Sequence, residues 1–407
     1  MKRNFVLIFA SVLAVGSASA ADGLYYIGSE AQQSVPLKWV VGLDLTYDDN
    51  VTPGSVPQDS GTSANPYLGC SFVSMTPQTT WDVYTRLGVI TYLDKPSSVP
   101  DTTYPQLHAG INLTHRFDER LRLSSRNFIS YELEPNYSYG FATSRQAGAY
   151  LFWESDNALG YRWFERLATY TGVNLTGLSY ADLQNQDRFT WTLYNQFRYQ
   201  LTPQQTVLTL DYRYGQTAAS DLASDSTDQY ILLGIEHRFS PNTILVARAG
   251  AQLRSVNVGG DSTNPFLEMA LNSQINEDLM LKAFVRYSVE GYDTVQQIST
   301  ATYDFSQRET LRVGVSGEYK ISPMFSIFGG VDYIPANFKD GNLVAGTGAA
   351  TVSGLSTDLV NISAGLTVKF TDNLYGTLSY NYTDATSDFA YQSYNRNRVT
   401  VGVRYEF

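Results

Sequence analysis

The chain ends in Val399-Thr-Val-Gly-Val-Arg-Tyr-Glu-Phe407, and this stretch decides the fold. Its odd-numbered positions are all apolar or aromatic, whereas the even-numbered positions between them are polar or glycine. Successive side chains of a β-strand point to opposite faces of the sheet, so a strand with one buried face shows this period of two residues. The pattern predicts that the chain finishes on a strand with one apolar and one polar face.

The amino terminus has the pattern of a secretory signal peptide. Lys2 and Arg3 form a basic region, residues 5–15 are an apolar run, and Ala18-Ser-Ala20 is a small-residue cleavage site. The apolar run is too short to span a bilayer as a helix, which argues against a retained anchor. We expect residues 1–20 to be cleaved and residues 21–37 to form a short periplasmic segment ahead of one domain at 38–407.

Composition narrows the class of protein further. The net charge is −11, which argues against nucleic acid as a partner. The sequence has a single cysteine, so an intrachain disulfide is excluded and the sheet itself must supply the stability. Tyrosine (30) and phenylalanine (20) are abundant.

Alternating runs begin near residue 38 and continue to the end of the chain. They predict about 18 strands, with 16 as the next candidate, near 38–48, 65–76, 79–93, 104–117, 121–134, 141–155, 159–175, 187–202, 205–217, 227–240, 243–256, 265–276, 279–292, 309–322, 324–336, 357–370, 373–386 and 394–407.

Two classes of connection alternate between these strands. Eight are tight and carry Pro, Asn or Asp, which preset turn dihedrals, among them one at Ser155-Asp-Asn-Ala158. Nine are longer and polar, and the longest spans residues 336–356. Short periplasmic turns alternating with long external loops are typical of a transmembrane antiparallel up-and-down β-barrel of the bacterial outer membrane, embedded in its lipid. A soluble sandwich has no reason to sort its loops in this way.

The two faces of each strand can be assigned from charge. In residues 279–287 one face is apolar and the other carries Lys282 and Arg286. An Arg or Lys on the lipid face at midplane costs about 2–4 kcal/mol, so the charged face must be luminal. We also expect Trp39, Trp81, Trp153 and Trp163 to lie near the periplasmic ends of strands.

A barrel of this size leaves water inside, so the charged faces are predicted to line a pore. The pore-lining candidates are Arg86, Arg126, Arg166, Arg198, Arg213, Arg248, Arg286, Arg312, Asp82, Asp211, Glu236, Glu268 and Asp332. These charges either set ion preference and orient solutes or pair across strands and fix the wall, and the two roles are compatible. The loop at 337–356 either folds into the lumen or forms a mobile lid.

Signatures of chemistry are missing from the sequence. It contains no HExxH, GxSxG or Walker motif and no Cys/His cluster. His108 is the one histidine expected to face inward, and a lone histidine without a placed nucleophile favours a structural role. We therefore expect no enzyme activity, no cofactor and no metal.

The first strand ends in Tyr47-Asp-Asp-Asn50, and the strand signatures Tyr212-Arg-Tyr214 and Arg404-Tyr-Glu-Phe407 follow later in the chain. In these features the chain resembles the β-barrel porin 2 family. The resemblance implies an outer-membrane barrel, mostly of unassigned cargo.

These observations predict a porin for passive diffusion of small hydrophilic solutes. The alternatives are a pore for exopolysaccharide export, whose Arg-lined wall guides an anionic polymer, and a surface receptor or adhesin. We expect the C-terminal strand ending in Phe407 to engage the barrel-assembly machinery. Oligomers are compatible with the fold, although no strand is recognisable as an interface.

Overall fold

The computed structural model describes residues 37–53, 58–133, 148–181, 187–203, 205–220, 224–257, 260–389 and 392–407. These residues form 21 strands in one antiparallel sheet. The predicted signal peptide and residues 21–36 of the predicted periplasmic segment lie outside the described residues. Within the described ranges, no helix is long and apolar enough to cross a membrane.

The first part of the sheet contains β1 (Leu37–Asp48), β2 (Gly61–Met75), β3 (Thr79–Tyr92), β4 (Thr103–Arg116), β5 (Leu121–Glu132), β6 (Tyr150–Phe164), β7 (Leu167–Tyr180), β8 (Arg188–Thr202), β9 (Thr206–Ala219) and β10 (Ser226–Ser240). The second part contains β11 (Thr243–Val256), β12 (Gly260–Gln274), β13 (Leu279–Glu290), β14 (Val295–Ile298), β15 (Ala301–Lys320), β16 (Phe325–Tyr333), β17 (Ala336–Ala345), β18 (Thr351–Val352), β19 (Leu355–Lys369), β20 (Leu374–Ser387) and β21 (Tyr394–Glu406).

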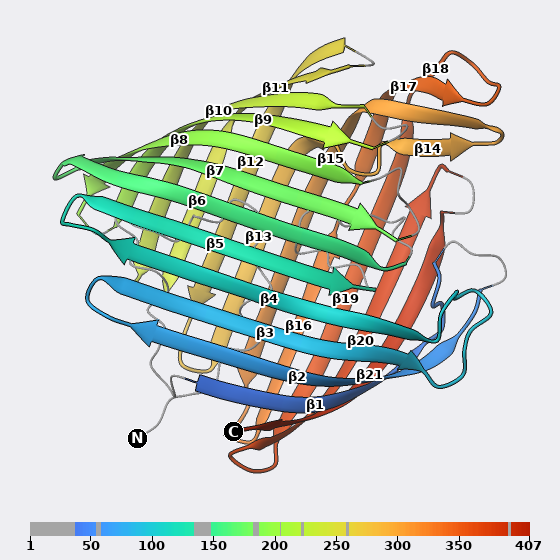
Figure 1. Ribbon diagram of the computed structural model, residues 1–407, viewed down its shortest axis with the longest axis horizontal. Coiled ribbons are helices and arrows are strands. Elements are labelled where there is room, and N and C mark those ends of the chain that lie inside the picture. Colours follow the sequence, from blue (N-terminus) through green and yellow to red (C-terminus); the bar gives the residue numbers. More distant parts are fainter. Residues whose placement is uncertain are drawn as a thin grey trace.

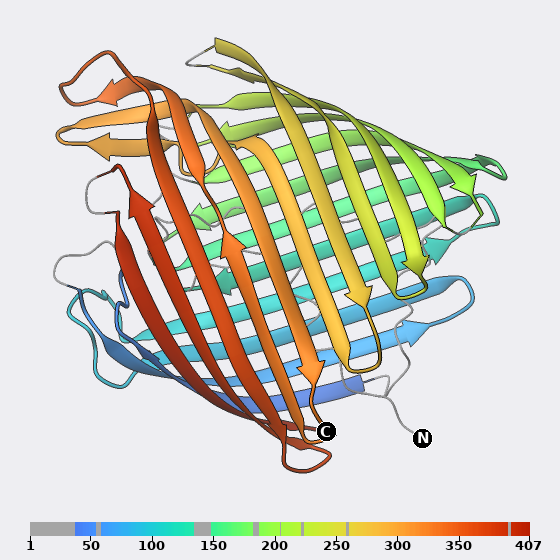
Figure 2. The same cartoon turned by 180° about the vertical axis from the view of Figure 1, so that it is seen from behind.

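The sheet closes into a barrel, as Figures 1 and 2 show from opposite sides. β1 pairs with β2 on one side and with β21 on the other. At the seam the Trp39 amide donates to the Phe407 carbonyl at 2.8 Å, and the Phe407 amide donates to the Trp39 carbonyl at 3.0 Å. Closure removes the free edges, so the backbone can be buried in lipid with its hydrogen bonds made.

Eighteen strands make up the barrel wall, which confirms the predicted number. β17 continues β16, because both pair with β15 and with β19. Among the described strands, β14 pairs only with β15 and β18 only with β17, so both belong to connections at the loop end of the barrel and not to its wall. The labels of β14, β17 and β18 accordingly lie together at one end of the barrel in Figure 1.

The two classes of connection are sorted to opposite ends of the barrel. The short ones lie at what we call the turn end, on the left of and below the barrel in Figure 1, and the longer ones lie at the loop end. One turn was predicted in the wrong place. Residues 155–158 lie inside β6, and the turn is instead at Glu165 and Arg166.

The register explains this error. Asn157 pairs with Ser125 of β5 and with Val173 of β7, so the polar run continues the ladder rather than reversing the chain. The shift also moves Trp153, which lies four residues into β6 from the loop end and not at the turn end. Trp39, Trp81 and Trp163 lie near the turn end as predicted.

The barrel is apolar outside and charged inside. On β1, five alternate side chains from Trp39 to Tyr47 are each 39–50% exposed and apolar or aromatic. The largest fully buried side chains include four arginines, which are Arg198, Arg248, Arg308 and Arg312. A soluble protein shows the opposite distribution, so this pattern fits a barrel surrounded by lipid.

Candidate functional site: a constricted lumen

A network of ion pairs covers the inner face of β8 to β12. Arg198 of β8 reaches across β9 to Glu236 of β10, with N–O distances of 2.5 and 2.7 Å. Arg248 of β11 contacts Asp211 at 3.1 Å and Glu268 at 2.6 Å.

Arg213 of β9 completes the network. It lies 3.3 Å from Asp211 and 3.5 Å from Glu268. The six residues of this network are all among the sequence-predicted candidates. Each arginine contacts a carboxylate of another strand, and Arg248 contacts carboxylates of three, so the network ties five neighbouring strands together.

A second cluster closes the loop end of β13. Glu290, the last residue of β13, accepts hydrogen bonds from Arg312 at 2.7 and 2.8 Å and from Arg308 at 3.0 Å. The Arg308 guanidinium also donates to the Tyr292 carbonyl at 3.2 Å. These side chains are almost fully buried. Two guanidiniums therefore fix the point at which the chain leaves the wall.

Residues 291–298, which we call the inward segment, turn into the lumen after Glu290. β12 and β13 pair only as far as Leu267 and Tyr287, although β13 continues to pair with β15 through Glu290. Beyond this point β12 stays paired with β11 but not with β13, and the Gln252 side chain of β11 contacts the β13 backbone instead. Its amide nitrogen donates to the Val289 carbonyl at 2.8 Å, and its amide oxygen accepts from the Val289 amide at 2.9 Å.

The inward segment then crosses to other strands. Tyr292 packs against the buried cluster of Tyr150, Phe152 and Leu178 on β6 and β7. Arg188 of β8 donates to the Thr294 hydroxyl at 3.3 Å. These contacts join strands that are far apart around the barrel.

The segment is also held from the loop end. Gln392, in the connection between β20 and β21, donates to the Gln296 amide oxygen at 2.8 Å. Val295 and Gln296 are only 1% and 0% exposed. The segment as far as Gln296 is thus packed against the inner wall, and it narrows the channel.

The loop at 337–356, considered from the sequence as a candidate constriction, lies elsewhere. Its first part forms β17, which pairs with β15 from Thr302 to Thr310 and extends the wall. Phe338 of this strand packs in a buried cluster with Phe305 and Phe389. The constriction comes from the preceding external connection instead.

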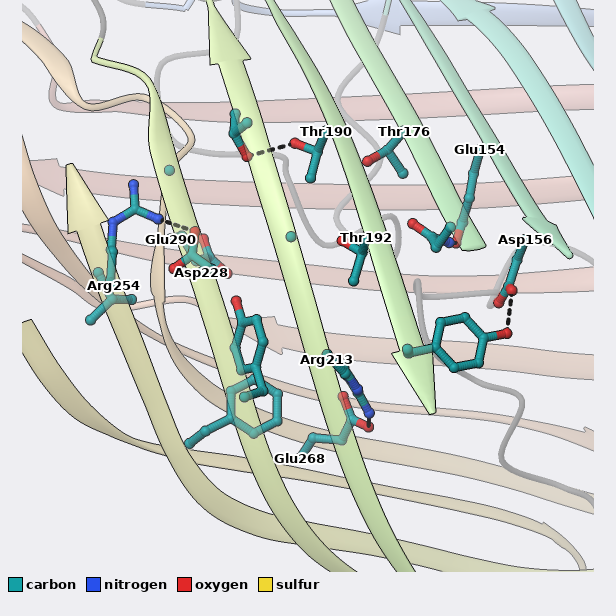
Figure 3. A pocket seen from close by; sticks show the side chains of 18 of the residues that line it. Glu154, Asp156, Thr176, Thr190, Thr192, Arg213, Asp228, Arg254, Glu268 and Glu290 are labelled. Atoms are coloured by element: carbon teal, nitrogen blue, oxygen red, sulfur yellow. Dashed lines mark hydrogen bonds and ion pairs between the residues drawn. The ribbon is translucent and has the colours of Figure 1, made fainter. Parts of the chain in front are cut away.

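Below the inward segment lies a cavity of about 210 Å³. Side chains of β6 to β13 line it, and Gly291 and Tyr292 close it on one side. Figure 3 shows the labelled carboxylates, threonines and arginines directed into this space from neighbouring strands. Its six acids are Glu154, Asp156, Asp211, Asp228, Glu268 and Glu290, and its four arginines are Arg188, Arg213, Arg254 and Arg286.

The arginines and carboxylates that line the cavity are only partly joined in ion pairs. Arg254 bonds Asp228 at 2.7 Å, and the Tyr194 hydroxyl donates to Asp156 at 2.6 Å. Within the described part of the chain, Arg188 and Arg286 make no ion pair with a carboxylate. The cavity therefore offers a polar solute the guanidiniums of Arg188 and Arg286, together with carboxylates and hydroxyls that are engaged in the wall.

Gly291 leaves room between two of these guanidiniums. A Cβ at this position would lie 3.1 Å from Nη1 of Arg188 and 3.3 Å from Nη2 of Arg254. Both distances are shorter than ordinary van der Waals contact. The absence of a side chain here keeps the cavity open beside the inward segment.

The remaining sequence-predicted residues are spread around the wall. Arg86 bonds Asp44 at 2.9 Å, and Arg126 lies 3.6 Å from Glu154. Asp82 and Asp332 each accept a hydrogen bond from an asparagine of the next strand, Asn112 and Asn361, at 3.3 Å. Arg312 belongs to the Glu290 cluster, and Arg286 lines the cavity.

Arg166 does not face the lumen from a strand, contrary to the sequence-based prediction. It lies exposed in the turn between β6 and β7. The misplaced turn at 155–158 is the cause, because it extended the following strand through this residue.

Sequence reasoning also missed several residues of the constriction. Arg188 follows from the parity that assigns Arg198, since both are even-numbered residues of β8. Gln252 shares the inward parity of Arg248 and Arg254 on β11, but nothing local indicates its contact with Val289 of β13. Tyr292 lies outside the strands, so parity does not apply to it.

The described residues hold no group of three or more His, Cys, Asp or Glu side chains arranged to bind a metal ion. His108 lies 3.2 Å from Glu132, and its ring packs edge-on against Phe128 with centroids 4.8 Å apart. This histidine is part of the packed inner wall.

Comparison with known proteins gives a fold-level likeness only. The sequence matches no family model and no curated protein. The outer membrane protein OpdK from Pseudomonas aeruginosa is 14% identical over 91% of this chain and 99% of its own, with a TM-score of 0.46. OccAB4 from Acinetobacter baumannii is 14% identical over 93% and 100%, with a TM-score of 0.44. Such values carry no argument about function, so the conclusions below rest on the chain itself.

Proposed function

We propose that the chain is a bacterial outer-membrane porin that lets small hydrophilic solutes diffuse passively through a water-filled lumen. The observation that carries this proposal is the closed 18-strand barrel, apolar outside and lined inside by charged and hydroxyl groups around an open cavity. Barrels of 16 to 18 strands enclose more space than their side chains fill. The inward segment sets the narrowest part of the path.

Single-channel recording tests this directly. Purified protein reconstituted in planar bilayers should give stepwise ohmic conductance without nucleotide or any other energy source. Folded, reconstituted protein without conductance would exclude an open pore. Folding can be checked independently by β-rich circular dichroism and by heat-dependent mobility on gels.

The structure favours a diffusion pore over export of an anionic polysaccharide. The polymer hypothesis needed free arginines along the wall, but Arg198, Arg213, Arg248 and Arg312 all have carboxylate partners. Block of the conductance by uronic-acid oligomers would speak for the export alternative.

We also propose that assembly depends on the last residue. Phe407 completes the seam with Trp39, and its side chain is 60% exposed on the outer face. Phe407→Ala should lower the amount of folded barrel in cells if the assembly machinery reads this aromatic, while refolding of the purified chain in detergent stays unchanged. A defect only in detergent refolding would contradict recognition by the machinery. Membership of the β-barrel porin 2 family remains part of this proposal.

A further inference from the structure

Four polar side chains lie on the outer, lipid-facing surface in the middle of β5 and β6. They are Ser125, Asn127, Ser155 and Asn157, and we call them the polar ring. Ser125 donates to the Asn157 carbonyl oxygen and Ser155 to the Asn127 carbonyl oxygen, both at 2.6 Å. Asn127 and Asn157 donate back to the Ser125 and Ser155 hydroxyls at 3.0 and 2.9 Å.

The outward direction follows from the alternation along β6. Ser155 and Asn157 share a face with Leu159 and Trp163, which are 50% and 51% exposed. Asp156, which lies between them, and Glu154, which precedes Ser155, both line the luminal cavity. The polar ring therefore points away from the lumen.

The polar ring is also deep in the wall. Asn157 is the eighth of the 15 residues of β6, between Trp153 toward the loop end and Trp163 toward the turn end. Aromatic side chains of this kind mark the two membrane surfaces, so the groups between them face hydrocarbon.

More polar groups continue along the same outer wall. Asn195 of β8 donates to the Thr171 hydroxyl of β7 at 2.6 Å. On the same face of β8, Leu193 and Phe197 are 52% and 48% exposed. By contrast, the outer face of β1 is apolar or aromatic from Trp39 to Tyr47. The polar stretch thus belongs to one side of the barrel.

Lipid acyl chains cannot form hydrogen bonds with the polar groups of the ring. A primary amide has two N–H donors and two acceptor lone pairs, and each asparagine of the polar ring uses one of each inside the ring. One donor and one acceptor per amide are left, at a depth that water does not reach. An unmet polar group in hydrocarbon is costly, whereas a hydrogen bond to another membrane-embedded surface removes that cost.

We propose that the polar ring is the in-membrane contact with a second copy of this chain. A suitable partner must present donors and acceptors at the same depth. A second copy inserted in the same direction carries its own ring at that height. A two-fold axis along the membrane normal brings ring against ring, and the equal numbers of remaining donors and acceptors make the surface self-complementary.

Cysteine cross-linking tests the contact. Cys70 is the only cysteine, so Cys70→Ser gives a cysteine-free background. In that background, Ser155→Cys should form a disulfide-linked dimer when membranes are treated with copper phenanthroline. The matched control is Ala283→Cys on the outer face of β13, on another side of the barrel, which should stay monomeric. Absence of a Ser155→Cys dimer, or equal dimer from both variants, would overturn the proposal.

A second measurement does not rely on cysteine. Light scattering should give two chains for the wild type in mild detergent and one chain for the variant Ser125→Ala/Asn127→Leu/Ser155→Ala/Asn157→Leu. Conductance per channel should be unchanged, because the polar ring does not face the lumen. A monomeric wild type, a variant that stays dimeric, or a cross-link from Ser155→Cys to a protein of different mass would each refute a contact between copies. If the variant fails to fold, the cross-linking result decides.

Discussion

Replacing Gln252 by leucine should loosen the inward segment and raise the conductance. The Gln252 side chain is 0% exposed and pairs with both backbone groups of Val289, as a neighbouring strand would. Leucine has a similar volume but neither donates nor accepts. The substitution therefore leaves the Val289 amide and carbonyl without their partners while it changes packing little.

Gln252 also donates to Asp228 at 2.8 Å and to Tyr230 at 3.2 Å on the neighbouring strand, but the effect on the inward segment follows from the two bonds to Val289. A buried polar group that loses its partner costs about 1–3 kcal/mol, so two groups cost about 2–6 kcal/mol. At about 1.4 kcal/mol per tenfold change, the population in which residues 289–298 have left their place rises about 30-fold to about 10⁴-fold. The contacts of Tyr292, Thr294 and Gln296 remain, so we expect transitions to a wider state rather than permanent loss of the constriction.

The assay is single-channel recording of Gln252→Leu beside Gln200→Leu. Gln200 lies on β8, and its side chain makes no hydrogen bond within the described residues, so the same substitution there should leave the conductance unchanged. The Gln252→Leu channel should show a larger mean conductance or frequent excursions to a higher level. If its traces match those of the wild type and of Gln200→Leu, the inward segment is not held by Gln252 and the reasoning fails.

Three further predictions follow from the lumen and its turns. Arg198→Met and Glu236→Gln should each lower the free energy of unfolding by about 3–5 kcal/mol, because each removes one partner of a buried ion pair. The double variant should lose less than the sum of the two. Urea unfolding in lipid vesicles measures this, and strictly additive losses would contradict the pairing. Gly291→Leu should lower the single-channel conductance, because its side chain fills the gap between the Arg188 and Arg254 guanidiniums; an unchanged conductance would show that solutes pass elsewhere. In the turn between β4 and β5, the amides of Arg120 and Leu121 donate to Asp118 and hold the pKa of its carboxyl below the ordinary value. Because this carboxyl has a lower pKa in the folded state, its ionised form stabilises the fold above the ordinary pKa of about 3.9, and the stabilisation is lost as pH falls through the folded value. Asp118→Asn should therefore be less stable than the wild type at pH 7. In acid, the urea midpoints of the two proteins should converge.

The barrel could be predicted from the sequence because its signal is local. In a strand such as Val399–Phe407, nine residues are enough to assign the two faces. For most other strands, the residues of the following turn show where the strand ends. The same parity placed Arg198, Arg248 and Glu236 inside. Which carboxylate each arginine would meet was beyond reach, because Arg198 and Glu236 lie two strands apart and pair across the strand between them.

The constriction could not be predicted, for the opposite reason. Residues 291–298 resemble part of an ordinary external loop in sequence, and no local pattern marks them as buried. Its position depends on Gln252, Arg188 and Gln392, which lie on separate strands and loops. The longer Gly-rich loop at 337–356 had the stronger local signal, yet its strand pairing with β15 keeps it in the wall.

The misplaced turn at residues 155–158 has a different and more informative cause. The turn was predicted there because Asp156 and Asn157 are of residue types that preset turn dihedrals. A second rule, that the outward face of a lipid-facing strand is apolar, also fails in this run. Asp156 obeys the rule, because it faces the cavity, but Ser155 and Asn157 break it by facing outward in the middle of a wall strand. The rule holds only where the outer face meets lipid. Natural sequences break local rules mainly where function or a partner compensates for the cost. The misplaced turn and the polar ring therefore share Ser155 and Asn157. It follows that making the ring apolar should restore the ordinary pattern of a lipid-facing strand and preserve the barrel, and that what is lost should be the contact that justified the exception.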